Sequence, residues 1–307
     1  MIADSELNDL CVRVRLENDP FKNKKIQIHI PTCLDDRSNN TKRIFNCFSF
    51  WMPYCIEIAN QLENSFLLSL NASDWGTDNF LSMTSQNLDN IIPDEYAMFE
   101  SKKINNFIGW TSFDQFYVHW KKRKNVMFWR GSTTGSPIDS VKSLTELQRI
   151  KVCLDHANIS NFDIRISNIV QNRIPKQIIR QWLNKKNIQG KRVTENRFKD
   201  FKYYPDLSGN NQLCGSWGTI RKYLRGNLIF KPNYQSQMFY DRLVQKWDHY
   251  IPVNLDFSDL SQQYAWAEAN QYKAANIAWH GHCMAKKYLN NLKDDFINVA
   301  IKKLQII

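Results

Sequence analysis

Short apolar segments with the composition of β-strands alternate with segments of helical periodicity along most of this chain, and this alternation constrains the fold more than any other feature. Strands are predicted at residues 25–30, 66–70, 125–129, 162–166, 202–207, 227–231 and 250–253. Helices are predicted at 53–63, 140–155, 216–225 and 235–247, and from about 259 to 303. Because strands that alternate with helices favour parallel sheets covered by helices, we predict an α/β fold with two Rossmann-like, doubly wound domains. Such domains bind their ligands outside the carboxyl ends of the strands.

The length of the chain and one cluster of charge predict where these domains divide. The chain has 307 residues, about twice the usual length of a single domain. A run of basic residues at 121–124 (KKRK) separates a weakly patterned region from the strand predicted at 125–129. We therefore predict an N-terminal domain at 1–124 and a C-terminal domain at 125–307, with the last helix packing back on the N-terminal domain.

The composition is that of a soluble globular protein and excludes several classes. Apolar residues make up 43% of the chain and charged residues 23%, which excludes a collagen-like or fully disordered chain. No apolar run reaches the roughly 18 residues of a membrane-spanning helix, and the first residues (MIADSE) are acidic, unlike a secretory signal. The seven cysteines are odd in number and include no CxxC pair, so we expect reduced, mostly buried thiols and a cytoplasmic protein.

Positive charge is concentrated in the second part of the chain. Residues 1–125 contain 14 basic and 16 acidic side chains, whereas residues 126–307 contain 27 and 14. Residues 171–231 alone contain 14 basic and three acidic side chains, which would attract phosphate-bearing partners or an anionic membrane surface. A solvated helix face is the bland alternative. A nucleic-acid-binding protein that uses the aromatic residues at 199–204 (KDFKYY) is another, although no helix-turn-helix, RNP or zinc-finger signature is present.

A glycine-rich segment at 206–226 (DLSGNNQLCGSWGTIRKYLRG) is the most informative part of the chain. Its glycines allow the backbone to approach a ligand, Ser216 is placed to cap the following helix, and the N–H groups at that helix start form a seat for a diphosphate. Arg221 and Arg225 lie four residues apart on one helical face, where they would add bonds to phosphate oxygens. The alternative is a glycine-rich turn before a surface helix.

Two shorter segments also follow predicted strands. The segment 129–135 (WRGSTTG) is rich in glycine and hydroxyl groups, and its alternative interpretation is a polar turn in which Arg130 forms a structural ion pair. Asp74, in the segment 70–76 (LNASDWG), follows the strand at 66–70. A carboxylate there faces the crevice of a doubly wound domain and can take a proton from an acceptor hydroxyl. An Asx turn before Gly76 is the alternative.

Several other motifs are absent or badly placed. His280 and His282 suggest a metal, but on the predicted helix they point about 200° apart, so no metal site is expected. The chain has no P-loop, no GxSxG and no GxGxxG, which are the motifs typical of NTPases, hydrolases and dehydrogenases. The sequence therefore does not favour these three functions. It also lacks a DxD triplet, which counts against a metal-held sugar nucleotide.

Taken together, these segments resemble glycosyltransferase family 90, which includes bacterial LpsA-type lipopolysaccharide glycosyltransferases, fungal capsule-associated xylosyltransferases and Rumi-type protein O-glucosyltransferases. The matching segments are FWRGSTTG at 128–135, KY at 202–203, DLSGN at 206–210, SW at 216–217, GNLIFK at 226–231, WDHYIPV at 247–253 and DFSDL at 256–260. They stand in the family's order over about residues 65–285, and the first 60 residues have no recognisable counterpart. IPD at 92–94 and the SW pair are most similar to the bacterial members.

The resemblance implies a GT-B fold, in which two domains face a central cleft, and an inverting, metal-independent transferase. The co-substrate is then a nucleotide sugar, usually UDP-linked, that donates a hexose or pentose, and no other cofactor is expected. The first domain would serve the acceptor, a glycan or glycolipid such as lipopolysaccharide, and the second would bind the donor. Peripheral contact with the anionic inner face of a membrane is expected, and a nucleic-acid partner is not.

The resemblance also implies roles for individual residues. Asp74 matches the position of the family's catalytic base. Donor binding is implied for Arg130, Gly131, Ser132, Thr134, Gly215, Ser216, Trp217, Gly218 and Arg221. Rumi-like and fungal members have an arginine where this chain has Gly218, so either Arg221 or nearby backbone N–H groups are expected to contact the diphosphate. A catalytically inactive sugar-nucleotide-binding protein is the alternative to an active enzyme.

Overall fold

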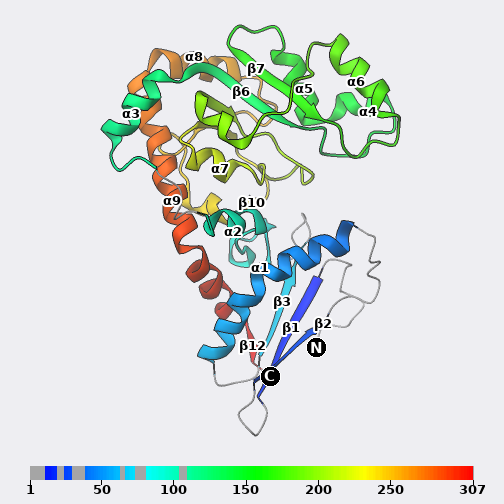
Figure 1. Ribbon diagram of the computed structural model, residues 1–307, viewed down its shortest axis with the longest axis vertical. Coiled ribbons are helices and arrows are strands. Elements are labelled where there is room, and N and C mark those ends of the chain that lie inside the picture. The colour runs from blue at the N-terminus through cyan, green and yellow to red at the C-terminus, as the bar shows by residue number, and fades with distance from the viewer. Residues whose placement is uncertain are drawn as a thin grey trace. The chain divides into compact units, whose positions relative to one another are not determined.

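The computed structural model describes residues 11–18, 24–29, 39–62, 66–72, 81–103 and 109–306 (Figure 1). The chain divides into two compact units. The first unit combines residues 1–105 with 236–242 and 288–307, and the second combines 106–235 with 243–287. Helix α9 (Gln271–Lys302) contributes residues to both units. This division into compact units differs from the domain boundary expected between residues 124 and 125, which stays a prediction.

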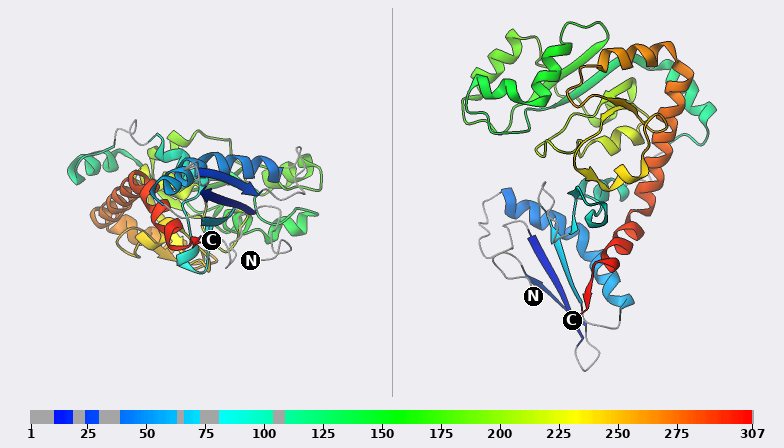
Figure 2. Two further views of the ribbon diagram at one scale, coloured as in Figure 1. Left: turned by 90° about the horizontal axis from the view of Figure 1, so that it is seen from below. Right: turned by 180° about the vertical axis from the view of Figure 1, so that it is seen from behind.

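The first unit is built on a sheet whose strands run mostly antiparallel. Its order is β12 (Gln305–Ile306), β3 (Phe66–Asn71), β1 (Cys11–Asn18) and β2 (Lys24–His29), and β4 (Leu81–Ser82) pairs with β3 in parallel. Helix α1 (Asn39–Gln61) lies along this sheet (Figures 1 and 2). The sheet differs from the parallel, doubly wound sheet expected here, because the short connection at 19–23 joins antiparallel neighbours and a parallel crossover needs a dozen or more residues.

The segment 236–242 also belongs to the first unit, and the helix predicted at 235–247 is wrong. Strand β10 (Gln237–Met238) pairs antiparallel with β5 (Thr84–Ser85), and the short 3-10 helix η5 (Phe239–Leu243) follows it. Asp241 Oδ2 accepts a hydrogen bond from Met238 N at 2.8 Å, and Arg242 Nη2 donates to Leu88 O at 2.9 Å. Pairing with distant segments satisfies these backbone groups, so tertiary contacts override the local helical periodicity.

Helix α1 is longer than the predicted helix at 53–63 and continues through Pro53. Within the first unit, α1 contacts the last part of α9 through the rings of Tyr54 and Phe296, 5.4 Å apart. An ion pair of 2.5 Å between Lys293 Nζ and Glu57 Oε2 joins the same two helices. In the described ranges, this unit also contains α2 (Glu95–Ser101) and the 3-10 turn η2 (Leu88–Asn90).

The second unit contains a five-stranded sheet that is parallel throughout the residues described. Its order is β7 (Phe162–Asn168), β6 (Lys124–Ser132), β8 (Phe201–Pro205), β9 (Leu228–Pro232) and β11 (Ile251–Val253). Numbered along the chain, the strands stand in the order 2-1-3-4-5, a doubly wound arrangement in which the winding reverses between β6 and β8. The α/β class is therefore confirmed, and the predicted strands of this region form one parallel sheet.

Helices connect these strands in the expected alternation (Figure 1). The connecting helices are α4 (Val141–Glu146) and α5 (Gln148–His156) between β6 and β7, α6 (Lys176–Lys185) between β7 and β8, and α7 (Thr219–Leu224) between β8 and β9. Helix α3 (Phe113–Lys122) precedes β6, and α8 (Leu260–Ala269) follows β11. The single helix predicted at 140–155 is divided into α4 and α5, because Leu147 is extended with φ −68° and ψ 130°. β8 and β9 are buried along their whole length, as expected for central strands covered on both faces.

The cysteines and the helices of the described residues can be compared with what the composition predicts. Among the described cysteines, Cys47, Cys55, Cys153 and Cys214 have buried thiols, whereas the thiol of Cys283 is exposed. Burial raises the pKa of Cys55 and Cys153 to about 12, so both stay protonated at neutral pH. No helix in the described ranges combines the length and the apolar character of a membrane span.

Candidate functional site

The reversal of winding between β6 and β8 brings two sequence-predicted loops to the same edge of the second unit's sheet. β6 ends at Ser132, within the turn 131–135, and β8 ends at Pro205, before the loop 206–218. Parallel strands end at one edge of their sheet, and doubly wound domains bind ligands in the crevice beside such a reversal. We refer to residues 131–135 and 206–218 as the switch-point site.

The buried side chain of Arg149 joins the two loops of the switch-point site. Its Nη1 donates a hydrogen bond to Ser132 O at 3.0 Å, and its Nε donates one to Ser208 O at 2.6 Å. The guanidinium also lies over the ring of Trp129, 5.4 Å from its centroid, and burial lowers its pKa from the ordinary value. Sequence reasoning missed Arg149 because it stands inside α5, away from any motif.

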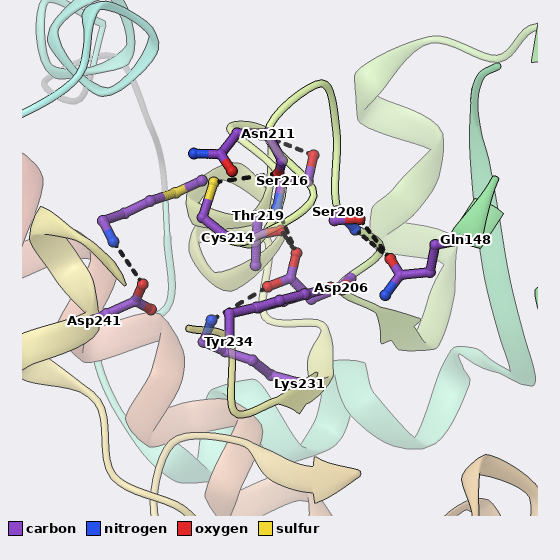
Figure 3. A network of polar contacts seen from close by, with 12 residues as sticks. Gln148, Asp206, Ser208, Asn211, Cys214, Ser216, Thr219, Lys231, Tyr234 and Asp241 are labelled. Carbon is purple, nitrogen blue, oxygen red and sulfur yellow. Dashed lines mark hydrogen bonds and ion pairs between the residues drawn. The ribbon is translucent and has the colours of Figure 1, made fainter. Parts of the chain in front are cut away.

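Two glutamine side chains add further links between these loops. Gln148 Oε1 accepts hydrogen bonds from the backbone N and the Oγ of Ser208, at 2.9 and 2.6 Å (Figure 3). Gln171 Oε1 accepts from Gly135 N at 2.8 Å, and its Nε2 donates to Asn210 Oδ1 at 2.6 Å. The linked segments meet around Leu147, Gln148 and Arg149, where Thr134, Gly135, Ser208, Gly209 and Gln212 lie together.

The fully buried carboxylate of Asp206 organises the glycine-rich loop (Figure 3). Its Oδ1 accepts hydrogen bonds from Ser216 N at 2.9 Å and from Thr219 Oγ1 at 2.5 Å. Its Oδ2 lies 3.6 Å from Lys231 Nζ, a buried ion pair that balances the charge. A Cβ at Gly215 would lie 2.4 Å from Asp206 Oδ2, so the loop can close over this carboxylate only with glycine there.

The strand-end turn places its predicted residues in different surroundings. Arg130 Nη2 forms an ion pair of 2.6 Å with Asp163 Oδ2 on β7, which is the structural role that the sequence left open as an alternative. A Cβ at Gly131 would lie 2.3 Å from the ring of Trp129, so the indole requires glycine beside it. Ser132 Oγ and Thr134 Oγ1 are hydrogen-bonded to each other. The hydroxyl pair therefore belongs to the switch-point site, whereas the guanidinium of Arg130 is engaged on the β7 side.

Basic side chains of α7 gather around one carboxylate. Glu195 lies 2.7 Å from Lys222 Nζ, 3.6 Å from Arg225 Nη1 and 3.9 Å from Arg221 Nε. Burial alone would raise the pKa of Glu195, but the three cations together lower it. Burial lowers the pKa of Lys222 to about 8, against the pull of Glu195. A Cβ at Gly218 would lie 3.3 Å from Arg221 Nη2, so the predicted Arg221 reaches back to the glycine-rich loop.

Ser216 does not cap α7 in the way the sequence predicts. Gly218 is the N-cap residue and no side chain bonds to the helix start there. Ser216, two residues before the N-cap, instead accepts a hydrogen bond at its Oγ from Gly218 N at 3.3 Å. Trp217 is half-buried between them. Asp206 Oδ1 accepts hydrogen bonds from Ser216 N and from the hydroxyl of Thr219. These bonds fix the loop before α7, and the helix begins without a serine cap.

The predicted base and the two candidate metal ligands are not part of this site as described. Asp74 lies outside the described residues, beyond the end of β3 at Asn71. His280 Nδ1 is 2.6 Å from Asp248 Oδ1, whereas His282 is buried with its Nδ1 2.7 Å from Leu224 O, so the two imidazoles have different partners. In the described ranges, no group of three or more histidine, cysteine, aspartate or glutamate side chains is arranged to hold a metal ion.

The aromatic residues of the basic stretch at 199–204 are buried. Phe201, Tyr203 and Tyr204 lie in β8 and are each exposed to 8% or less. Nucleic-acid bases stack on exposed ring faces, so these rings offer no platform for stacking. The specific feature that supported a nucleic-acid-binding function is therefore missing from this stretch.

Comparison with known proteins relates the site to a family. The family model described as glycosyl transferase family 90 matches residues 102–299, a range that includes the whole switch-point site. Protein O-glucosyltransferase 2 of Danio rerio is 30% identical over 178 residues, which cover 55% of this chain and 30% of that protein. Protein O-glucosyltransferase 1 of Bos taurus is 25% identical over 179 residues, 58% of this chain and 40% of that protein.

A viral protein is similar over the same extent. Uncharacterized protein 027R of Frog virus 3 (isolate Goorha) is 23% identical over 175 residues, 53% of this chain and 18% of that protein. The matched region thus spans less than half the length of each of these three relatives. The family model, by contrast, covers well over half of this chain and confirms the resemblance found in its motifs. On this evidence, the chain belongs to glycosyl transferase family 90.

Proposed function

We propose that this protein is a glycosyltransferase that moves a hexose or pentose from a UDP-linked sugar to a hydroxyl of an acceptor. The observation that carries this proposal is the switch-point site, where two loops rich in glycine and hydroxyl groups meet at the reversal of a doubly wound sheet. Doubly wound sheets bind nucleotides at such reversals. Family membership supports sugar transfer, as do the names of the two animal relatives, which are protein O-glucosyltransferases.

The donor would lie across both loops. Ser132, Thr134 and the backbone N–H groups beside Gly131 face it from one loop, and residues 215–218 face it from the other. Arg221, whose guanidinium end lies near Gly218, would contribute positive charge to the diphosphate. The cluster around Glu195 supports this assignment, because it gathers the side chains of Arg221, Lys222 and Arg225 near the glycine-rich loop. Arg130 would not contact the donor itself. It would support the site by fixing the end of β6 through its ion pair with Asp163.

The proposed chemistry is a single inverting displacement in a GT-B arrangement, with residues 1–124 on the acceptor side and 125–307 on the donor side. Asp74 would take the proton of the acceptor hydroxyl as its oxygen attacks the anomeric carbon. The bond from that carbon to the phosphate oxygen breaks on the opposite face, and the electron pair leaves with UDP. The backbone N–H groups and Arg221 would stabilise the charge that develops on the diphosphate without a metal ion.

The acceptor and the location are part of the same proposal. A glycan or glycolipid such as lipopolysaccharide fits the resemblance of the motifs, and a protein hydroxyl is the acceptor that the relatives' names suggest. The excess of 27 basic over 14 acidic side chains at 126–307 supports a cytoplasmic enzyme that contacts an anionic membrane face.

A panel of nucleotide sugars tests the donor without knowledge of the acceptor. The full chain is mixed with UDP-, GDP- and CMP-linked sugars, and thermal stabilisation and slow hydrolysis of each sugar are measured. We expect stabilisation by UDP and one UDP-sugar, with slow release of UDP from the latter. Binding without any turnover, in the presence of every acceptor extract tried, would favour the inactive sugar-nucleotide-binding protein. No binding of any nucleotide sugar would contradict the proposal.

A further inference from the structure

A basic groove of about 950 Å³ lies at the opposite edge of the second unit's sheet from the switch-point site. The groove includes Lys124, where β6 begins, and Lys199 and Asp200, which directly precede β8. Its walls come from α3, the start of β6, the 3-10 helix η4 (Glu195–Asp200) and the end of α7. The cationic residues of its lining are Lys122, Arg123, Lys124, Arg197, Lys199 and Arg225.

Three of these cations are available to a ligand. Arg123 is buried and donates to the carbonyl oxygens of Gly226 and Arg225 at 2.7 and 2.9 Å, so it has a structural role. Arg197 is paired with Asp200, the one carboxylate in the described lining, at 3.0 Å. The exposed side chains of Lys122, Lys124 and Lys199 have no ion-pair partner among the residues described. Positive charge therefore faces the groove from two separate segments.

We infer that this groove binds an anionic glycan chain, one that carries phosphate or carboxylate groups. The inference rests on the proposed transferase function for its choice of a glycan, and on charge complementarity for the anionic groups. The groove is concave, and its lysines lie on separate segments of its wall. A flat bilayer would contact only the rim of such a groove, whereas a narrow chain can enter it. A chain of saccharide width can meet lysines from both segments at once.

Single-stranded nucleic acid fits the groove less well. Trp110 lies in the lining of the groove, and its ring packs on Phe116 and His282, with centroid distances of 4.9 and 5.1 Å. The guanidinium of Arg123 lies 5.2 Å from the same ring. Phe116, His282 and Arg123 pack against this ring, which leaves less of it for stacking with a base than single-stranded binding sites offer.

The distance to the switch-point site limits which acceptors could use both. β6 runs from the groove to the switch-point site over nine residues, which corresponds to roughly 26 Å at about 3.3 Å per residue. A monosaccharide or disaccharide is too short to contact both ends. The groove would thus favour acceptors that are long, acidic glycans, by holding a part of the chain that does not react.

Charge reversal tests the groove separately from the donor site. The full chain is titrated, at about 50 mM salt where screening is weak, against a fluorescein-labelled heparin hexasaccharide as an acidic probe and against maltohexaose as a neutral one. The test variant is Lys122→Glu/Lys199→Glu, and the matched control is Lys185→Glu/Lys186→Glu, which makes the same charge change at exposed positions of α6 and its C-cap. Fluorescence anisotropy reports binding of the labelled probe, and calorimetry reports maltohexaose and UDP.

We expect the heparin probe to bind the wild type, maltohexaose not to bind, and the groove variant to lose at least about tenfold in affinity while the α6 control stays within about twofold. UDP affinity should be equal in the wild type and both variants. If UDP did not bind the wild type, the result would contradict the proposed function but would not decide whether the groove binds an anionic glycan. Equal losses in both variants would overturn the inference. It would also be overturned if the groove lysines instead governed binding to oligothymidylate or to phosphatidylserine vesicles while the hexasaccharide did not bind.

Discussion

At the scale of single residues, Arg149 couples the two loops of the switch-point site through the carbonyl oxygens of Ser132 and Ser208. Lysine would keep the charge there but could not donate in both directions from one rigid plane. Hydrogen bonds from charged groups contribute about 1.5–3 kcal/mol each, so Arg149→Lys should lower the free energy of unfolding by about 2 kcal/mol. It should also weaken UDP binding about tenfold, because the loops lose their common support.

Urea denaturation and calorimetry with UDP measure these two effects. Lys151→Arg, at an exposed position of the same helix, is the control and should change neither value. If Arg149→Lys were as stable as the wild type and bound UDP equally well, Arg149 would not be a positioning residue of the site.

Gly215 allows a prediction with a control in the same loop. A methyl group at Gly215 would come within 2.4 Å of the Asp206 carboxylate, whereas one at Gly209 would meet its nearest neighbour, Arg149 Nη2, at 3.5 Å, an ordinary contact. We expect Gly215→Ala to displace the buried carboxylate and to lower the unfolding free energy by about 2–3 kcal/mol, and Gly209→Ala to change it by less than about 1 kcal/mol. Thermal denaturation of both variants tests this, and equal effects would mean that the loop does not depend on Asp206.

At the scale of elements, α9 is tied to α7 in the second unit by the buried side chain of His282, whose Nδ1 donates to Leu224 O. Burial lowers the pKa of His282 to about 4, although this hydrogen bond opposes the shift. The unfolded chain, with a pKa near 6.5, then binds more protons than the folded chain between about pH 4 and 6.5. The free energy of unfolding should therefore fall as the pH falls through this window, by about 3 kcal/mol in total.

Chemical denaturation at a series of pH values between about 4 and 7 measures this slope. His282→Gln should flatten it, although the variant is expected to be less stable overall. His119→Gln, at an exposed position of α3, should keep the wild-type slope. A steep slope that survives in His282→Gln would assign the acid sensitivity to other groups.

Elements of the second unit were the easier ones to predict from the sequence. Central parallel strands are buried on both faces and read as short apolar runs, which is why β8 and β9 could be located within a few residues. In the first unit, β1 (CVRVRLEN) alternates between apolar and polar residues, and this alternation is itself typical of a strand. The pairing of β10 with β5 joins segments about 150 residues apart, and no local pattern encodes such a contact.

The candidate site was predictable to the same limited degree. Glycine and hydroxyl patterns located both loops, because the turns need those residue types. The contacts of Arg149, Gln148 and Glu195 could not be predicted, since each is a bond between a polar side chain and a segment distant in sequence. The position of Ser216 before the helix predicts a capping role, but in the structure its backbone N–H donates to the buried carboxylate of Asp206.

At the scale of the whole molecule, the proposed reaction requires a base from the first part of the chain and a donor site from the second. Asp74→Asn removes the proton acceptor but keeps the size of the side chain. We expect this variant to bind UDP with wild-type affinity and to lose sugar transfer by several orders of magnitude. Transfer rates measured with a UDP-sugar at saturation test this, and wild-type rates would remove Asp74 from the mechanism.

Titration of the full chain with UDP by isothermal calorimetry tests whether the switch-point site binds a nucleoside diphosphate. We expect a one-to-one complex whose affinity falls about tenfold in Arg221→Ala, which loses a charge facing the diphosphate, and stays unchanged in Lys185→Ala, which loses an equal charge on α6. If UDP did not bind at millimolar concentration, the switch-point site would not be a diphosphate site. The same would follow if Arg221→Ala and Arg149→Lys both bound UDP with wild-type affinity.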